Sequence, residues 1–167
     1  MSGGDIFHKS ISKTKVFMKK QIAAVETFHD AFKIKNNYQA TADLDDKTVL
    51  LRYKLMREEN EEYLEAAQNG DLIEIADALG DMLYILCGTI LSHGMQDKIE
   101  EVFDEIQRSN MSKLDKDGQP IYREDGKVLK SDQYFKPNIK AILENSWFFY
   151  GSHEYFSYAF MAVAFLH

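Results

Sequence analysis

The first stretch with apolar residues at helical spacing runs from about Ser12 to Ile34. It follows residues 1–11, which read as a loose arm. A set of apolar side chains recurs at steps of three, four and seven residues, which indicates an amphipathic helix: Phe17, Ala24, Val25, Phe28 and Phe32. We expect this set to face the core and the Asn36-Asn37 pair to end the helix.

Two longer helices are predicted next. The second helix runs from about Lys47 to Gln68, with Asp45 or Asp46 as its N-cap. Asn69-Gly70-Asp71 then supplies a C-terminal glycine and a new N-cap, and so short a link makes the two helices antiparallel neighbours. The third helix, about Asp71 to Ser92, is apolar almost all round, so we expect it to be buried on most sides.

A shorter helix and a polar segment complete the predicted domain. The helix is expected over about Gln96 to Gln107, with four residues on its core side: Ile99, Val102, Phe103 and Ile106. After Arg108 two Asp-Gly pairs, at Asp117 and Asp125, indicate tight turns and one small hairpin. This segment is mildly basic, with eight Lys and Arg against five Asp and Glu between Ile106 and Leu143.

These elements define an all-α protein, an antiparallel bundle of about four helices with a basic loop segment at its C-terminal end. One long pair and two shorter helices are too few to cover the apolar third helix. We therefore expect a homo-oligomer, most simply a homodimer, to complete the bundle. The predicted domain spans residues 12–143, and residues 144–167 form an aromatic-rich extension with nine aromatic side chains and no Lys or Arg.

Composition narrows the classes of protein. A chain of 167 residues with a net charge of −7 fits one globular domain and argues against broad nucleic-acid binding. The apolar run at 156–166 is too short to cross a bilayer, and no secretory signal is visible at the N-terminus. The one cysteine, Cys87, forms no internal disulfide and is expected to fill the core. A cytoplasmic location follows as the expectation, with no membrane partner.

Candidate chemistry lies in an acidic stretch. From Glu58 to Asp97 there are ten acidic residues and no Lys or Arg. Helical geometry places six of them on two faces, one on each long helix: Glu58, Glu59 and Glu62, then Glu74, Asp77 and Asp81. The first set continues the stripe of Leu51 and Leu55, so it faces inward if that stripe is buried. The alternative to a functional site is a glutamate-rich surface helix whose carboxylates are simply solvated.

Clustered carboxylates need a counter-charge, and a divalent cation supplies it most simply. Hard oxygen ligands without His or Cys select Mg²⁺, with Mn²⁺ as a substitute. Six carboxylates are more than one Mg²⁺ takes from a protein, so two or more ions are expected. All six acids are the candidate ligands.

The spacing also carries a family resemblance. Glu-Glu-x-x-Glu at 58–62, followed by Glu-x-x-Asp at 74–77 inside EIADALGDMLYIL, resembles the metal-binding pattern of the MazG-like all-α nucleoside triphosphate pyrophosphohydrolases. That superfamily includes the all-α dUTPases and dCTPases and the phosphoribosyl-ATP pyrophosphohydrolases. The resemblance covers about Val16 to Leu143. A second alignment would use Gly80-Asp81 and would put Ala78 where a Glu is expected. We therefore take Glu74 and Asp77 as the first pair of ligands and Asp81, one turn further along the same face, as the second choice.

The resemblance implies an enzyme that cleaves a nucleoside triphosphate to the monophosphate and pyrophosphate, with dUTP or dCTP favoured. It implies that Glu59 is the general base for the attacking water. In the basic segment, Lys113, Lys127 and Lys130 are candidates for contacting pyrophosphate, and Asn110 for bonding the sugar or base. Two other classes stay open: a noncatalytic nucleotide or metal sensor, and a purely structural bundle.

Overall fold

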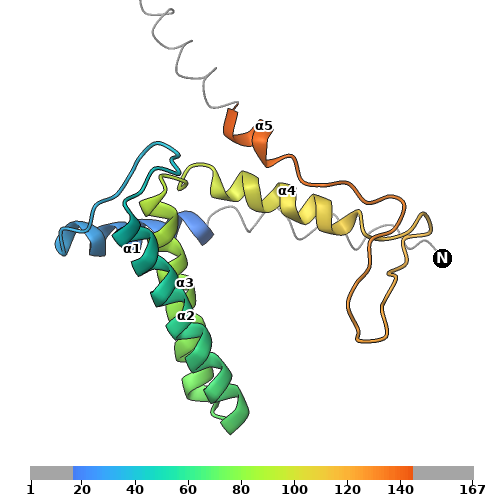
Figure 1. Cartoon of the computed structure of the whole chain (residues 1–167), viewed down its shortest axis with the longest axis horizontal. Helices are drawn as coiled ribbons and strands as arrows, with labels where there is room; N and C mark the ends of the chain where they lie inside the picture. The colour runs from blue at the N-terminus through green and yellow to red at the C-terminus, as the bar shows by residue number, and fades with distance from the viewer. Residues whose placement is uncertain (1–16, 145–167) are drawn as a thin grey trace, which may run out of the picture. The chain divides into compact units, whose positions relative to one another are not determined.

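The computed structural model describes residues 17–144, which contain five α-helices (Figure 1). The helices are α1 (Phe17–Ala31), α2 (Asp46–Asn69), α3 (Leu72–Ser92), α4 (Ile99–Met111) and α5 (Ile139–Glu144). The described range has no β-strand, only an isolated bridge between Tyr122 and Val128. The predicted all-α class is confirmed. The predicted arm at 1–11 and residues 145–167 lie outside the described residues. The described residues fall into two compact units, which divide between Ile99 and Glu100.

The α2–α3 hairpin forms where the capping residues predict it. Asp45 is the N-cap of α2 and accepts a hydrogen bond from the Thr48 backbone N–H at 2.8 Å. Gly70 ends the helix in the left-handed region, at φ 70°, and Asp71 then caps α3 by accepting from the backbone N–H of Ile73 and of Glu74. Figure 1 shows α2 and α3 side by side as a long antiparallel pair.

Helix α1 is shorter than predicted and buries a different face. It ends at Ala31 because Lys33 adopts a left-handed φ of 58°, so Asn36 and Asn37 lie beyond it. Val25 is buried as expected, but the side chains buried with it are Ile22 and His29. Phe32 is 67% exposed. The expectation of a core stripe ending in Phe28 and Phe32 is wrong, since His29 occupies the inward position.

The core of the first unit lies where α1 packs on the C-terminal half of α3. Its buried members are Ile22, Val25, Cys87, Ile90 and Leu91. Cys87 is fully buried among these side chains, which confirms the core assignment for this cysteine.

The N-terminal half of α3 is not covered. Leu72 and Ile73 are 76% and 79% exposed, and Leu79 is also exposed. The expectation that α3 is buried on most sides is therefore wrong for the single chain. By length and composition α3 is also apolar enough to cross a membrane. The core helices of soluble proteins pass the same test, and the C-terminal half of α3 lies in the core of the first unit.

The connection between α1 and α2 is tied to the C-terminal end of α3. Asn37 donates from its backbone N–H to Leu91 O at 2.9 Å and from its side chain to Ser92 O at 2.6 Å. Further along, the Thr41 backbone N–H donates to His93 O at 2.9 Å. Gly94 follows with a left-handed φ of 64°, against the backbone of Gln39.

In the second unit, residues 112–138 are organised on α4. The helix begins later and ends later than predicted, and of its expected core side Val102 is buried while Phe103 and Ile106 are exposed. Buried Ser109 donates to Phe135 O at 2.8 Å, and Glu105 accepts from the Asn138 backbone N–H at 2.7 Å. The predicted hairpin forms around Gly126, whereas the short helix α5 was not predicted.

Gly94→Ala should destabilise the chain by more than about 3 kcal/mol. An added Cβ would lie 2.1 Å from Gln39 O, and a left-handed φ adds a further cost. Urea unfolding followed by circular dichroism measures the change. Gly70→Ala is the matched control, because its φ is also positive but nothing lies within 4 Å, and its expected cost is about 1 kcal/mol. Equal losses in the two variants would contradict the assigned contact.

Candidate active site

The register of the α2–α3 pair sets which side chains face one another. A Cβ added at Gly88 of α3 would lie 2.9 Å from a guanidinium nitrogen of Arg52 on α2. Seven residues back along α3 is Asp81, and seven residues forward along α2 is Glu59. Two helical turns return a side chain to nearly the same face, so Glu59 and Asp81 meet across the pair as Arg52 and Gly88 do.

Glu59 is the centre of the acidic cluster. Its side chain is partly buried, and its Oε2 atom is inaccessible to solvent and has no hydrogen-bond partner. Burial and then the charges of four neighbouring carboxylates raise the pKa of Glu59, in the order Glu62, Asp81, Glu58 and Asp77. Four of the other five predicted ligands therefore lie close enough to Glu59 for their charges to act on its carboxyl group.

The four neighbours of Glu59 lie at the surface. Glu58 and Glu62 are exposed, as are Asp77 and Asp81, and Leu51 is also exposed. The expectation that Glu58, Glu59 and Glu62 all face inward is correct only for Glu59. The reason is that the leucine stripe they continue is not covered within one chain.

Glu74 lies apart from this group, near the hairpin turn. It lines a pocket of about 330 Å³ that Glu62 also lines, together with Glu65, Ala66, Asn69 and Asp71. Glu62 is thus shared between the Glu59 cluster and this pocket. The six carboxylates occupy one continuous acidic strip along the α2–α3 pair.

The acidic residues offer the kind of ligand atom that a hard divalent cation prefers. The donors are carboxylate oxygens, and the buried Oε2 of Glu59 has no partner within the described range. Within residues 17–144, however, no three His, Cys, Asp or Glu side chains are gathered into a metal-binding group.

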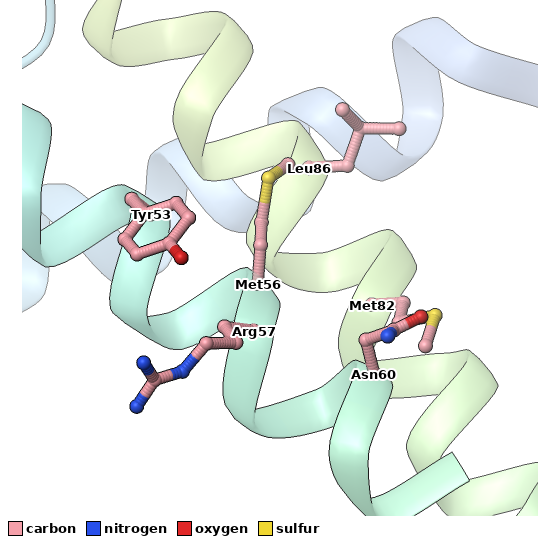
Figure 2. A pocket seen from close by; sticks show the side chains of 6 residues that line it. All are labelled: Tyr53, Met56, Arg57, Asn60, Met82 and Leu86. Atoms are coloured by element: carbon pink, nitrogen blue, oxygen red, sulfur yellow. The ribbon is translucent and has the colours of Figure 1, made fainter. Parts of the chain in front are cut away.

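A pocket on one edge of the same helix pair was not predicted. It has a volume of about 430 Å³ and is lined by Tyr53, Met56, Arg57 and Asn60 of α2 with Met82 and Leu86 of α3 (Figure 2). The signal in the sequence was the spacing of Tyr53, Met56 and Asn60 at i, i+3 and i+7, beside the acidic face. Most of its lining is apolar, which suits a flat organic group better than a phosphate.

In the second unit, three of the four predicted substrate-binding residues come together. Lys113 Nζ donates to Asn110 Oδ1 at 2.8 Å, and Lys130 Nζ lies 4.2 Å from the centre of the Tyr134 ring. The pKa of Tyr134 is lowered by a hydrogen bond with Ser109 and then by Lys130 and Lys113. Lys127 lies instead in the hairpin turn, where its backbone N–H donates to Asp125.

The α2–α3 pair carries the acidic strip on an all-α fold. A family model for phosphoribosyl-ATP pyrophosphohydrolase matches residues 25–110, just over half of the chain. The chain therefore belongs to the phosphoribosyl-ATP pyrophosphohydrolase family, within the MazG-like all-α superfamily, which confirms the resemblance and makes it a pyrophosphohydrolase. A search of curated proteins found no match to it.

Glu59→Gln should raise the melting temperature in EDTA at pH 7, by about 2 to 5 °C. The folded chain raises the pKa of Glu59 above its ordinary value of 4.5, so ionisation of this carboxyl opposes folding. The contribution of Glu59 to stability is fully present when the pH is below its ordinary pKa. That contribution is lost as the pH rises through the pKa that Glu59 has in the folded chain. The gain in the variant should therefore disappear in a melting series carried down to about pH 4.

Glu61→Gln is the matched control for that series. Glu61 is also on α2 but is exposed, and it pairs with Arg57 at 3.3 Å, so its loss should change the melting temperature little. An equal gain in both variants would show that only net charge matters.

Proposed function

We propose that the chain hydrolyses a nucleoside triphosphate to the monophosphate and pyrophosphate, with Mg²⁺ or Mn²⁺ as cofactor. The observation that supports this proposal is the partly buried Glu59 with its unpartnered Oε2, surrounded by four carboxylates. A partly buried carboxyl group with a raised pKa is a stronger base than an ordinary glutamate. The six acids are the proposed metal ligands, with two or more ions per site.

In the proposed reaction, water attacks the α-phosphorus and the bond to the bridging oxygen between the α- and β-phosphates breaks. Glu59 accepts a proton from the attacking water, and pyrophosphate departs with the bond's electron pair. When bound, Mg²⁺ would neutralise the phosphate charges and acidify water. The charges of Asp81 and Asp77 both raise the pKa of Glu59, so we propose both aspartates as metal ligands. Glu58 and Glu62 are proposed as ligands beside them.

The substrate belongs to the nucleoside triphosphate class, and three members are candidates. The sequence resemblance favours dUTP or dCTP, and the matched family is named for phosphoribosyl-ATP. Asn110, Lys113 and Lys130 are the proposed contacts for sugar, base or pyrophosphate, with Lys127 as a further cation. Neither nucleic acid nor membrane is a proposed partner, and the proposed location is the cytoplasm.

The exposed apolar side chains support a homo-oligomer. Both long helices carry large apolar side chains in contact with solvent, among them Leu50, Leu64, Ile73 and Leu79. A soluble chain gains free energy when such side chains are buried against a second copy, at about 25 cal/mol per Å². We propose a homodimer or a higher assembly in which the α2–α3 pairs face one another.

Glu59→Gln should lower kcat for pyrophosphate release by about 10²- to 10⁴-fold with KM nearly unchanged, because the general base is lost while shape is kept. The assay measures pyrophosphate and phosphate separately for dUTP, dCTP, phosphoribosyl-ATP and the common triphosphates, with Mg²⁺ or Mn²⁺. Glu61→Gln serves as the control and should retain activity. A normal rate in Glu59→Gln would exclude Glu59 as the base.

The same panel separates the other classes. A noncatalytic sensor would show a thermal shift with Mg²⁺ plus nucleotide and no pyrophosphate release. A structural bundle would show neither. Release of phosphate in place of pyrophosphate would contradict attack at the α-phosphorus.

Light scattering after size exclusion should give the mass of a dimer or a larger assembly. Ile73→Asp and Leu79→Asp together should shift the mass to that of one chain, because a charge on the exposed apolar face opposes association. Lys54→Gln, on an exposed position of α2, should leave the mass unchanged. A wild-type monomer would contradict the proposed assembly.

A further inference from the structure

Three helices of the first unit meet at a buried polar junction. His29 of α1 is only 2% exposed, and its Nδ1 lies 2.6 Å from Asn36 Oδ1. On the other side of the ring, Nε2 lies 3.4 Å from a terminal nitrogen of Arg52 on α2. Gly88 of α3 closes the junction, since an added Cβ there would lie 2.9 Å from Arg52 and 3.0 Å from His29.

The hydrogen bonds define how His29 holds Arg52. Asn36 Oδ1 is an acceptor, and the amide nitrogen of Asn36 lies 3.5 Å from Asp30 Oδ1, which fixes the amide orientation. The Nδ1 atom of His29 therefore carries the hydrogen, and Nε2 accepts from the guanidinium. His29 orients Arg52 in this way but does not neutralise its charge.

Arg52 keeps a positive charge that residues 17–144 leave unpaired. No carboxylate of that range lies within ion-pair distance of its guanidinium, and its Nε is buried without a hydrogen-bond partner. Burial lowers the pKa of Arg52, yet an arginine stays charged at neutral pH. A partly buried, oriented cation with unused donors suits a ligand that offers acceptor oxygens.

Arg52 lies on the same face of α2 as Glu59. The two are seven residues apart, which is two helical turns and about 10 Å along the axis. Gly88 has the same relation to Asp81 on α3, so the cation and the carboxylates lie along one seam between the same two helices. The separation between Arg52 and Glu59 is longer than the distance across the reacting atoms at the α-phosphorus. It matches the distance from the α-phosphorus to the far part of a nucleotide.

We propose that Arg52, oriented by His29 and given room by Gly88, binds acceptor oxygens on the part of the substrate remote from the scissile anhydride. The inference rests on the proposed function. The ligand chemistry is a phosphate or carbonyl oxygen, which a guanidinium binds through paired donors. An extra phosphate, as on phosphoribosyl-ATP, or a keto group, as on uracil, would supply it. Arg52 then selects among triphosphates, while the acids and Glu59 act on the phosphate chain they share.

Steady-state kinetics on phosphoribosyl-ATP, ATP, dUTP and dCTP test the proposal. Arg52→Gln should lower kcat/KM on the substrate that carries the recognised oxygens by about 10- to 100-fold, mostly through KM. Loss confined to phosphoribosyl-ATP, compared with ATP, identifies the extra phosphate. Loss on dUTP greater than on dCTP identifies the C4 carbonyl of uracil, which cytosine replaces with an amino group. Lys54→Gln removes a positive charge from an exposed position of the same helix and should leave all four values unchanged.

Gly88→Ala gives an independent variant that keeps the arginine. The added methyl group displaces the end of the Arg52 side chain, so the same substrate should lose affinity although Ala favours the helix. Gly80→Ala, also on α3, adds a methyl group where nothing lies within 4 Å and should retain wild-type KM. Melting temperatures of all variants separate a loss of recognition from a loss of folding.

The outcomes distinguish this inference from the function on which it rests. A wild type that releases no pyrophosphate from any of the four substrates overturns the proposed function and the inference together. A wild type that turns over, with Arg52→Gln and Gly88→Ala matching their controls, overturns the inference alone. An equal loss on all four substrates, or a loss in kcat only, also overturns it, since Arg52 would then act on shared or structural features.

Discussion

The α2–α3 pair holds Glu59 and four other carboxylates close to one another, and the rest of the first unit makes this possible. Antiparallel packing in one register places Glu59 among four other carboxylates, and burial of its Oε2 raises the free energy of the ionised site. A chain accepts such a cost only if stability comes from elsewhere. Here it comes from the caps of the two helices and from the apolar core at the other end of α3.

The two halves of α3 therefore differ in burial and in charge. Its C-terminal half is enclosed by α1, with Leu91 and Cys87 fully buried, whereas its N-terminal half carries the acids and exposed apolar side chains. The apolar core and the candidate site are thus separated along one helix. The acids can stay partly solvated, as exchange of a charged ligand requires, while the core remains dry. Arg52 and His29 lie against Gly88, in the C-terminal half of α3.

Local signals in the sequence predicted the hairpin well. Asp45, Gly70 and Asp71 act through their own backbone neighbours, so their residue types were enough to set the ends of α2 and α3. The acidic face was predictable for the same reason, because helical spacing alone gathers Glu58, Glu59 and Glu62.

Features set by contacts between distant segments were not predictable. The inward position of His29 depends on Asn36 and Arg52, and the early end of α1 depends on the backbone of Lys33. The burial of each carboxylate depends on how much of the leucine stripe of α2 another element covers. Within one chain most of that stripe stays exposed to solvent. The placing of Glu74 in a separate pocket follows from the hairpin turn, which spacing on a single helix does not describe.

The tie between the α1–α2 connection and α3 has a consequence for amide exchange with solvent. Asn37 and Thr41 close hydrogen bonds onto Leu91, Ser92 and His93, so the amides near that end of α3 open only with the whole unit. The hairpin turn has no such closure and lies at the opposite end of the same helix. Protection should fall steadily from Leu91 toward Leu72, which leaves the acidic strip in the region that opens at least cost.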